Sequence, residues 1–216
     1  MKKQLFGDRR RFCVSMTGIL LITFGIALFA HSYLGTDPHN AMLIRISELL
    51  SLPLGTIYWV FGGSYFVLQL IFGRRHIGIG TFVNWLISGY ITSGWIKMLN
   101  TLFGSADRFT DRLIFMIIGI LIISAGVSMY QSAGLGVAPY DVLSLCLSER
   151  TPLPYFLCRV LLDSVCALVC WRLGGILGIG TIICMFGLGP FIAVFNRLIS
   201  EPLLNGRAGL AHLNVR

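Results

Sequence analysis

The sequence predicts an all-α membrane protein in which about six transmembrane helices form two inverted three-helix repeats, each with a short re-entrant or interfacial helix. The first supporting observation is composition: 56% of the 216 residues are hydrophobic and only 12% are charged, whereas soluble domains carry about a quarter charged residues. The second is a series of apolar runs about 20 residues long, a length that crosses a bilayer. The third is a duplication of the first half of the chain in the second half.

The formal net charge of +8 comes from basic residues at the ends of the apolar runs. Basic residues so placed do not form one charged face, so we expect no nucleic-acid partner. They match the excess of Lys and Arg on the cytoplasmic side of membrane proteins. With the N-terminus inside, eleven Lys and Arg lie at inner ends of the segments and five at outer ends. We therefore expect a multi-pass protein with a cytoplasmic N-terminus.

The duplication is centred on the motif Leu-Gly-x-x-Pro, which occurs at 34–38 and again at 135–139. At the offset of 101 that relates the motifs, 13 of the 43 positions from 11 to 53 are identical. These identities include glycines, prolines and a Ser-Glu pair, which apolar composition alone would not produce in order. The motif Gly-x-Gly-Thr also recurs, at 78–81 and 178–181, after a slip of one residue.

The segments follow one another in the same order in both halves. The basic N-terminus and first apolar run resemble a secretory signal, but the run is long and no A-x-A site follows promptly, so we expect a retained helix. We expect a cytoplasmic N-terminal segment at 1–12, a first repeat at 13–99, a linker at 100–111, a second repeat at 112–199 and a tail at 200–216. The predicted spans cover about 13–33, 54–72, 82–99, 112–133, 153–171 and 182–199, with short helices at 38–50 and 139–150.

Glycine spacing and the number of spans predict how these segments are arranged. Gly18 and Gly25 are seven residues apart, as are Gly119 and Gly126, so each pair lies on one helix face and permits close helix packing. Three spans in each half force the second half to insert upside down relative to the first. This arrangement is the inverted repeat of many secondary transporters.

The starts of the two short helices are the first candidate binding site. Gly35 and Gly136 allow a sharp turn, and Pro38 and Pro139 then begin a helix. The free N–H groups at a helix start favour an anionic or strongly polar partner. Under inverted symmetry the two helices enter from opposite sides and bring together the side chains after each proline: His39, Asn40, Tyr140 and Asp141. The alternative is that both motifs merely turn the chain.

Arg159 and Asp163 are the second candidate site. They are four residues apart and can pair on one helix face. Charges within a span are costly and commonly face a cavity, so Asp163 is a candidate proton carrier and Arg159 a candidate anion ligand. A structural ion pair, or an Arg159 side chain that snorkels to the interface, is the alternative. Asn84 is a candidate for a polar path, or for a helix–helix hydrogen bond.

The glycines of the Gly-x-Gly-Thr motifs are candidate turns or hinges rather than a phosphate loop, since no strand precedes them. These glycines are Gly78, Gly80, Gly178 and Gly180. We expect no enzyme, because no nucleophile–base pair, H-E-x-x-H or Walker motif is present. The six cysteines include no C-x-x-C and have no His at zinc spacing, so we expect no metal and no cofactor.

The second motif copy resembles a known family. Its phrase Gly-Leu-Gly-Val-Ala-Pro-Tyr-Asp-Val-Leu, from Gly134 to Leu143, is similar to the G-L-G-x-x-P-W-D-V-L of the YczE/YyaS/YitT group of bacterial integral membrane proteins. Tyr140 stands where tryptophan is usual, and the first copy, with His39 and Asn40, departs further. The resemblance implies a protein of the bacterial inner membrane. It implies neither a substrate nor catalytic residues.

Three functions remain open at this level. The first is a small secondary transporter or permease for a small polar or amphipathic metabolite, working by rocking of one half on the other. The second is a membrane scaffold that assists a biosynthetic or signalling partner, which predicts a polar surface patch and no central cavity. The third is a homodimer that transports only as a pair, because six segments in 216 residues is small for a lone carrier.

Overall fold

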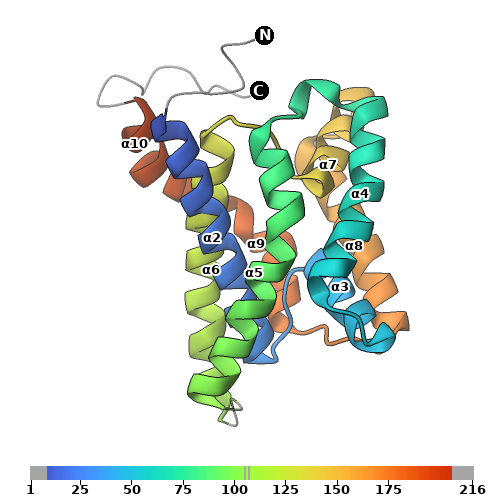
Figure 1. The fold of residues 1–216 in the computed structure, drawn as a ribbon, viewed down its shortest axis with the longest axis vertical. Coiled ribbons are helices and arrows are strands. Elements are labelled where there is room, and N and C mark those ends of the chain that lie inside the picture. The colour runs from blue at the N-terminus through green and yellow to red at the C-terminus, as the bar shows by residue number, and fades with distance from the viewer. Residues whose placement is uncertain (1–8, 105, 107, 206–216) are drawn as a thin grey trace.

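The computed structural model describes residues 9–104, 106 and 108–205, and the described residues form helices and connecting turns without a strand (Figure 1). The long helices of the first half are α2 (Arg9–Ser32), α4 (Leu54–Phe72) and α5 (Ile79–Phe103), with the short α3 (Pro38–Leu50) and the 3-10 turn η1 (Arg74–His76) between them. The second half contains α6 (Phe109–Ser132), the short α7 (Pro139–Arg150), α8 (Tyr155–Arg172), α9 (Ile179–Phe195), the π-helical turn η2 (Asn196–Ser200) and α10 (Glu201–Asn205).

The prolines and capping groups of the motifs explain where the helices begin. Pro38 and Pro139 occupy the first turns of α3 and α7, where a missing backbone N–H costs nothing. Asp37 caps α3 by accepting a hydrogen bond from the backbone N–H of Asn40 at 3.1 Å. In α5 and α9, the threonine of each Gly-x-Gly-Thr motif accepts a hydrogen bond from the backbone N–H of Gly78 or Gly178.

The helices form two groups that each mix elements of both halves. A long-helix bundle consists of α2, α5, α6 and α9, and a short-helix bundle consists of α3, α4, α7 and α8 (Figure 1). The long-helix bundle has a core between α2, α6 and α9, formed by Ile26, Phe29, Met116, Ile120, Ile123 and Cys184. The short-helix bundle has its own core, with Leu43 and Leu54 packed near Tyr140 and Cys166. Contacts between the bundles are made chiefly by α4 and α5.

Helices α2 and α6 lie at the centre of the long-helix bundle and approach closely at the glycines spaced seven residues apart. A Cβ on Gly18 would lie 2.7 Å from the backbone nitrogen of Tyr130, and one on Gly126 would lie 2.8 Å from the carbonyl oxygen of Gly18. Gly25 and Gly119 form the second such contact. Only glycine fits at this helix separation, as the spacing predicts.

Four stretches are long and apolar enough to cross a membrane: α2, α4, α6 and the continuous helical stretch Ile179–Leu204. The chain is therefore a multi-pass membrane protein. Of the two other long helices, α5 has 25 residues with interspersed polar side chains, and α8 has 18 residues that include Arg159, Asp163 and Arg172.

Two boundaries differ from those expected. The linker is shorter than 100–111, because α5 continues to Phe103 and α6 begins at Phe109; of the residues between, Ser105 and Asp107 lie outside the described ones. Within the expected tail, α10 covers Glu201–Asn205, and residues 206–216 lie outside the described part, as do 1–8 of the expected N-terminal segment.

Candidate functional site: a polar cavity between the two bundles

Each Leu-Gly-x-x-Pro motif is anchored on the Gly-x-Gly-Thr motif of the other half. The backbone N–H of Gly180 donates to the carbonyl oxygen of Leu34 at 2.9 Å, and that of Gly80 donates to Leu135 at 2.8 Å. These two hydrogen bonds are equivalent under the duplication: in one the donor is in the second half and the acceptor in the first, and in the other the roles are exchanged. The two halves therefore interlock at the places where the short helices begin.

The motif glycines are required by both conformation and space. Gly35 has φ +92° and Gly136 has φ +112°, a region that side chains with a Cβ disfavour. A Cβ on Gly136 would also lie 2.5 Å from Oγ1 of Thr81 and 2.6 Å from the backbone nitrogen of Gly78. Gly78, Gly80, Gly178 and Gly180 thus serve as docking points for the opposite motif and do not line the cavity.

Between the bundles lies a cavity of about 140 Å³ that residues from each of the helices α2 to α9 line. A water needs roughly 10–15 Å³ of such space, so the cavity has room for several waters or a small molecule. The first turns of α3 and α7 meet in its wall, where the rings of His39 and Tyr140 stack at 4.0 Å. These two residues occupy equivalent positions in the duplicated halves.

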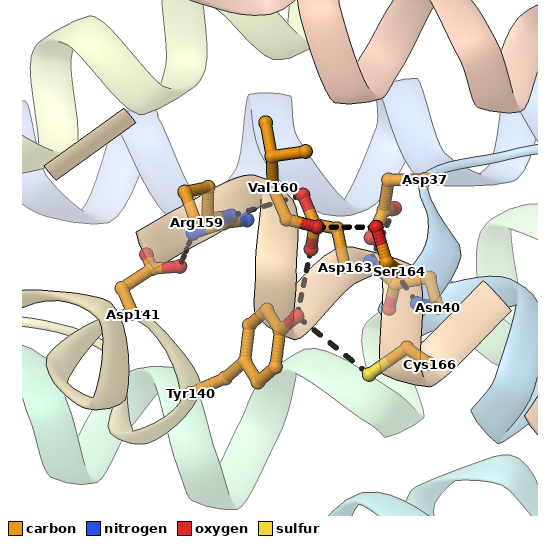
Figure 2. Close-up of polar contacts among 9 residues, drawn as sticks. All are labelled: Asp37, Asn40, Tyr140, Asp141, Arg159, Val160, Asp163, Ser164 and Cys166. Atoms are coloured by element: carbon orange, nitrogen blue, oxygen red, sulfur yellow. Dashed lines mark hydrogen bonds and ion pairs between the residues drawn. The ribbon is translucent and has the colours of Figure 1, made fainter. Parts of the chain in front are cut away.

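Arg159 joins two acidic residues at the cavity wall, as Figure 2 shows. Its guanidinium forms an ion pair with Asp141 through Nη1 and a longer contact of 3.3 Å with Asp163 through Nε. The hydroxyl of Tyr140 donates to the second oxygen of Asp163 at 2.7 Å, and the guanidinium lies over the Tyr140 ring at 5.0 Å. The network ties α7 to α8, and only 4% of Asp163 is exposed.

The first half makes the matching contact with neutral groups. The Tyr58 hydroxyl donates to the side-chain oxygen of Asn40, and these positions correspond, at the offset of 101, to Arg159 and Asp141. The contact between α3 and α4 is therefore an uncharged hydrogen bond, whereas the equivalent contact between α7 and α8 is an ion pair. The cavity wall is therefore charged on the side of the second half and neutral at the equivalent positions of the first half.

Two of the residues that line the cavity carry a buried polar atom that has no hydrogen-bond partner among the described residues. The Tyr130 hydroxyl is one, on a side chain that is 1% exposed, and Nε2 of His39 is the other. A buried polar atom without a partner costs about 1–3 kcal/mol. Such atoms at a cavity wall mark the place where a polar ligand or water would be bound.

One end of the molecule carries a cluster of charged side chains outside the long spans. Glu149, in the last turn of α7, forms an ion pair with Arg75 and a 3.3 Å contact with Nε2 of His76 in η1. The hydrogen bond from Arg75 lowers the pKa of the Glu149 carboxyl, against a smaller opposing effect of burial. At the opposite end lies a second cavity of about 310 Å³, lined by residues that include His31, Arg45 and Asn100.

Most candidate residues from the sequence lie in or beside the first cavity. His39, Asn40, Pro139, Tyr140, Asp141, Arg159 and Asn84 line it, and Asp163 lies behind Tyr140. Gly35, Gly136 and Pro38 hold the turns and are not in its lining.

The lining residues that were not predicted from the sequence include one carboxylate and four aromatic side chains: Asp37, Tyr58, Tyr65, Trp85 and Tyr130. Asp37 precedes Pro38 in the first motif only, and an acid at the start of a helix is fully explained by capping. Aromatic residues are common in apolar spans, so nothing in the sequence distinguished these four. Among the described residues, no three His, Cys, Asp or Glu side chains converge as metal ligands do.

A family model described as a family of unknown function (DUF6198) matches residues 9–197. The chain belongs to this family. Relatives of the chain include two Bacillus subtilis (strain 168) proteins, "Uncharacterized membrane protein YczE" and "Uncharacterized protein YyaS". The first is 26% identical over 80% of this chain and 79% of its own length, and the second is 24% identical over 87% and 93%.

A further relative of the DUF6198 chain is an uncharacterized protein from Haemophilus influenzae, 25% identical over 88% of this chain and 83% of its own length. No solved structure matches the chain. The resemblance to the YczE-like proteins is thereby confirmed. The similarity extends over most of the chain.

Proposed function

We propose that the protein is a small secondary transporter that carries a small polar or amphipathic molecule across the bacterial inner membrane. The observation that carries this proposal is the cavity between the bundles, which is lined by the starts of α3 and α7 and by Tyr130, whose hydroxyl has no partner among the described residues. Non-helical backbone at membrane depth is tolerated where it lines a cavity or is buried in protein. Transporter sites are built in this way from discontinuous helices at a repeat interface.

The proposed architecture has six crossings, made by α2, α4, α5, α6, α8 and α9, in two inverted repeats. The reciprocal Leu34–Gly180 and Leu135–Gly80 hydrogen bonds support this architecture. Helices α5 and α8 are long enough to cross, Asn84 of α5 lines the cavity, and Arg159 of α8 pairs with Asp141. The start of α2 and helix α10 lie at the same end of the molecule (Figure 1), as an even number of crossings requires.

The proposed moving parts are the two bundles rather than the two halves of the sequence. The halves interlock through backbone hydrogen bonds, so moving one half against the other would break both anchors. The bundles meet chiefly at α4 and α5, and the cavity lies between them. The ion-paired end at Glu149 and the hollow end at His31 fit one conformation of a rocking cycle.

A scaffold for another protein remains the alternative, and it calls for a polar docking surface. The large exposed side chains in the described part of the chain are mostly apolar along α4, α6, α8 and α9, as lipid contact requires. The cavity would also have no role in a scaffold. We therefore favour transport, without a catalytic step.

Cysteine labelling in membrane vesicles tests alternating access without knowledge of the substrate. The six native cysteines are replaced by serine or alanine, and Ser88→Cys is introduced on the cavity side of α5. We expect a membrane-impermeant maleimide to label this position in both right-side-out and inverted vesicles. The control is Thr92→Cys, which is equally buried on the same helix but does not line the cavity, and which should stay unlabelled. Labelling of Ser88→Cys from one side alone would exclude alternating access.

A further inference from the structure

We infer that the cavity binds one small organic cation, with the Asp37 carboxylate as its counter-charge and aromatic rings as its walls. This inference deepens the proposed function and rests on it, because it names the chemical class of the transported molecule. It starts from the balance of charge at the cavity. Asp37 lines the cavity from the start of α3 and takes part in neither of the ion pairs that Arg159 forms with Asp141 and Asp163.

Three carboxylates and one guanidinium stand around the cavity in the described part of the chain. Asp141 and Asp163 share Arg159, whereas among the described residues the hydrogen bonds of Asp37 come only from the backbone and side chain of Asn40, at 3.1 and 2.6 Å. No cation among the described residues pairs with Asp37.

The starts of the short helices offset part of this negative charge. Each helix N-terminus carries roughly half a positive charge, and Asp37 and Asp141 lie at the starts of α3 and α7. Arg159 and the two helix starts together offset about two of the three carboxylates. About one negative charge is left, and an uncompensated charge in a low-dielectric interior is costly. The cavity therefore favours a ligand with one positive charge.

The walls select an organic cation over an inorganic one. Tyr65 lies 5.6 Å from the His39 ring and 5.7 Å from the Tyr140 ring, and Tyr58 and Trp85 line the same space. Aromatic faces attract ammonium groups by the cation–π interaction. A bare metal ion would instead need several convergent oxygens, and no three acidic or His side chains in the described residues converge in that way.

Tyr130 supplies an independent indication of a ligand. Tyr130 lines the cavity from α6, on the bundle opposite to Asp37, and its buried hydroxyl has no hydrogen-bond partner in the described part of the chain. A molecule that contacts both bundles would satisfy this hydroxyl with a polar group and Asp37 with its positive end. A short molecule with an ammonium at one end and a hydroxyl or similar group at the other has the required chemistry.

Choline and its uncharged carbon analogue 3,3-dimethylbutan-1-ol form a matched pair of probes that differ in the positive charge. Binding to the purified full chain in detergent is measured by isothermal titration calorimetry. We expect choline to bind at least about tenfold more tightly than the alcohol. Equal affinity for choline and the alcohol, or binding of neither, would overturn the inference. Asp37 would then be neutralised by a bound proton and not by the ligand.

The Asp37→Asn variant assigns the charge to its residue. Asparagine caps a helix as well as aspartate does, so α3 keeps its start while the cavity loses one negative charge. We expect choline affinity to fall about tenfold and alcohol affinity to stay unchanged. Asp111→Asn, the same change at an exposed position of α6, should alter neither. Unchanged choline binding in Asp37→Asn would overturn the assignment.

Two further variants keep the test decisive if Asp37→Asn does not fold. Tyr65→Leu removes a ring from the wall, and choline affinity alone should fall. Tyr130→Phe removes the free hydroxyl, and both probes should weaken by a similar factor, severalfold. An equal loss for both probes in Tyr65→Leu would count against the cation. The maleimide labelling of Ser88→Cys does not depend on choline binding, so the two tests are independent. If choline binds more tightly than the alcohol but Ser88→Cys is labelled from one side alone, transport is excluded and the cation site is retained.

Discussion

Gly136 shows how a single residue constrains the position of a whole helix. Its positive φ and its contact with Thr81 fix the turn that leads into α7. Gly136→Ala should therefore destabilise the protein by about 1–3 kcal/mol, seen as a lower Tm of the purified protein. Gly94→Ala is the control, because no atom lies within 4 Å of the added Cβ and alanine favours the helix by up to about 1 kcal/mol. Equal Tm changes in both variants would contradict the proposed strain.

At this scale the sequence predicted one group of contacts and missed another. His39, Tyr140 and Asp141 come together because each follows a proline that starts a short helix, a relationship that duplication makes visible. The unpartnered Tyr130 hydroxyl was not predicted. Its position depends on which face of α6 meets the cavity, and that follows from the glycine contacts between α2 and α6, not from local pattern.

The short helix α7 is tied at its C-terminal end to η1 through Glu149. The hydrogen bond from Arg75 lowers the pKa of this carboxyl, so its stabilising contribution is present above the unfolded pKa of about 4.3. It is lost as the pH falls through the lower folded value. Because 35% of the Glu149 side chain is exposed, its ion pair is worth at most about 1 kcal/mol.

Glu149→Gln should accordingly lower Tm by a few degrees or less at pH 7, and the difference from the wild-type protein should disappear at about pH 3. Glu48→Gln is the control, since Glu48 occupies the equivalent place on α3 but pairs within its own helix, with Arg45. That variant should change Tm less at pH 7. A difference between Glu149→Gln and the wild-type protein that persists unchanged in acid would contradict the ion-pair explanation.

For the whole molecule, the sequence predicted the order of the helices but not their grouping. Apolar runs, prolines and glycines mark the segments locally. The mixed bundles arise from contacts between distant residues, such as those of α3 with α8 and of α4 with α7. Duplication indicated that equivalent segments exist, and it could not indicate that each motif docks on the other half.

The number of crossings is the property of the whole chain that separates the proposed architecture from the simplest alternative. If only the four most apolar stretches cross, a cytoplasmic N-terminus places Gly104 inside and Thr151 outside. Six crossings place Gly104 outside and Thr151 inside, because α5 then crosses as well. Alkaline phosphatase, which is active only outside, and green fluorescent protein, which fluoresces only inside when exported unfolded, can each be fused after these residues. We expect phosphatase activity after Gly104 and fluorescence after Thr151. The reverse pattern would leave Arg159 on a helix that does not cross, and it would remove the membrane-depth cavity on which the proposed transport depends.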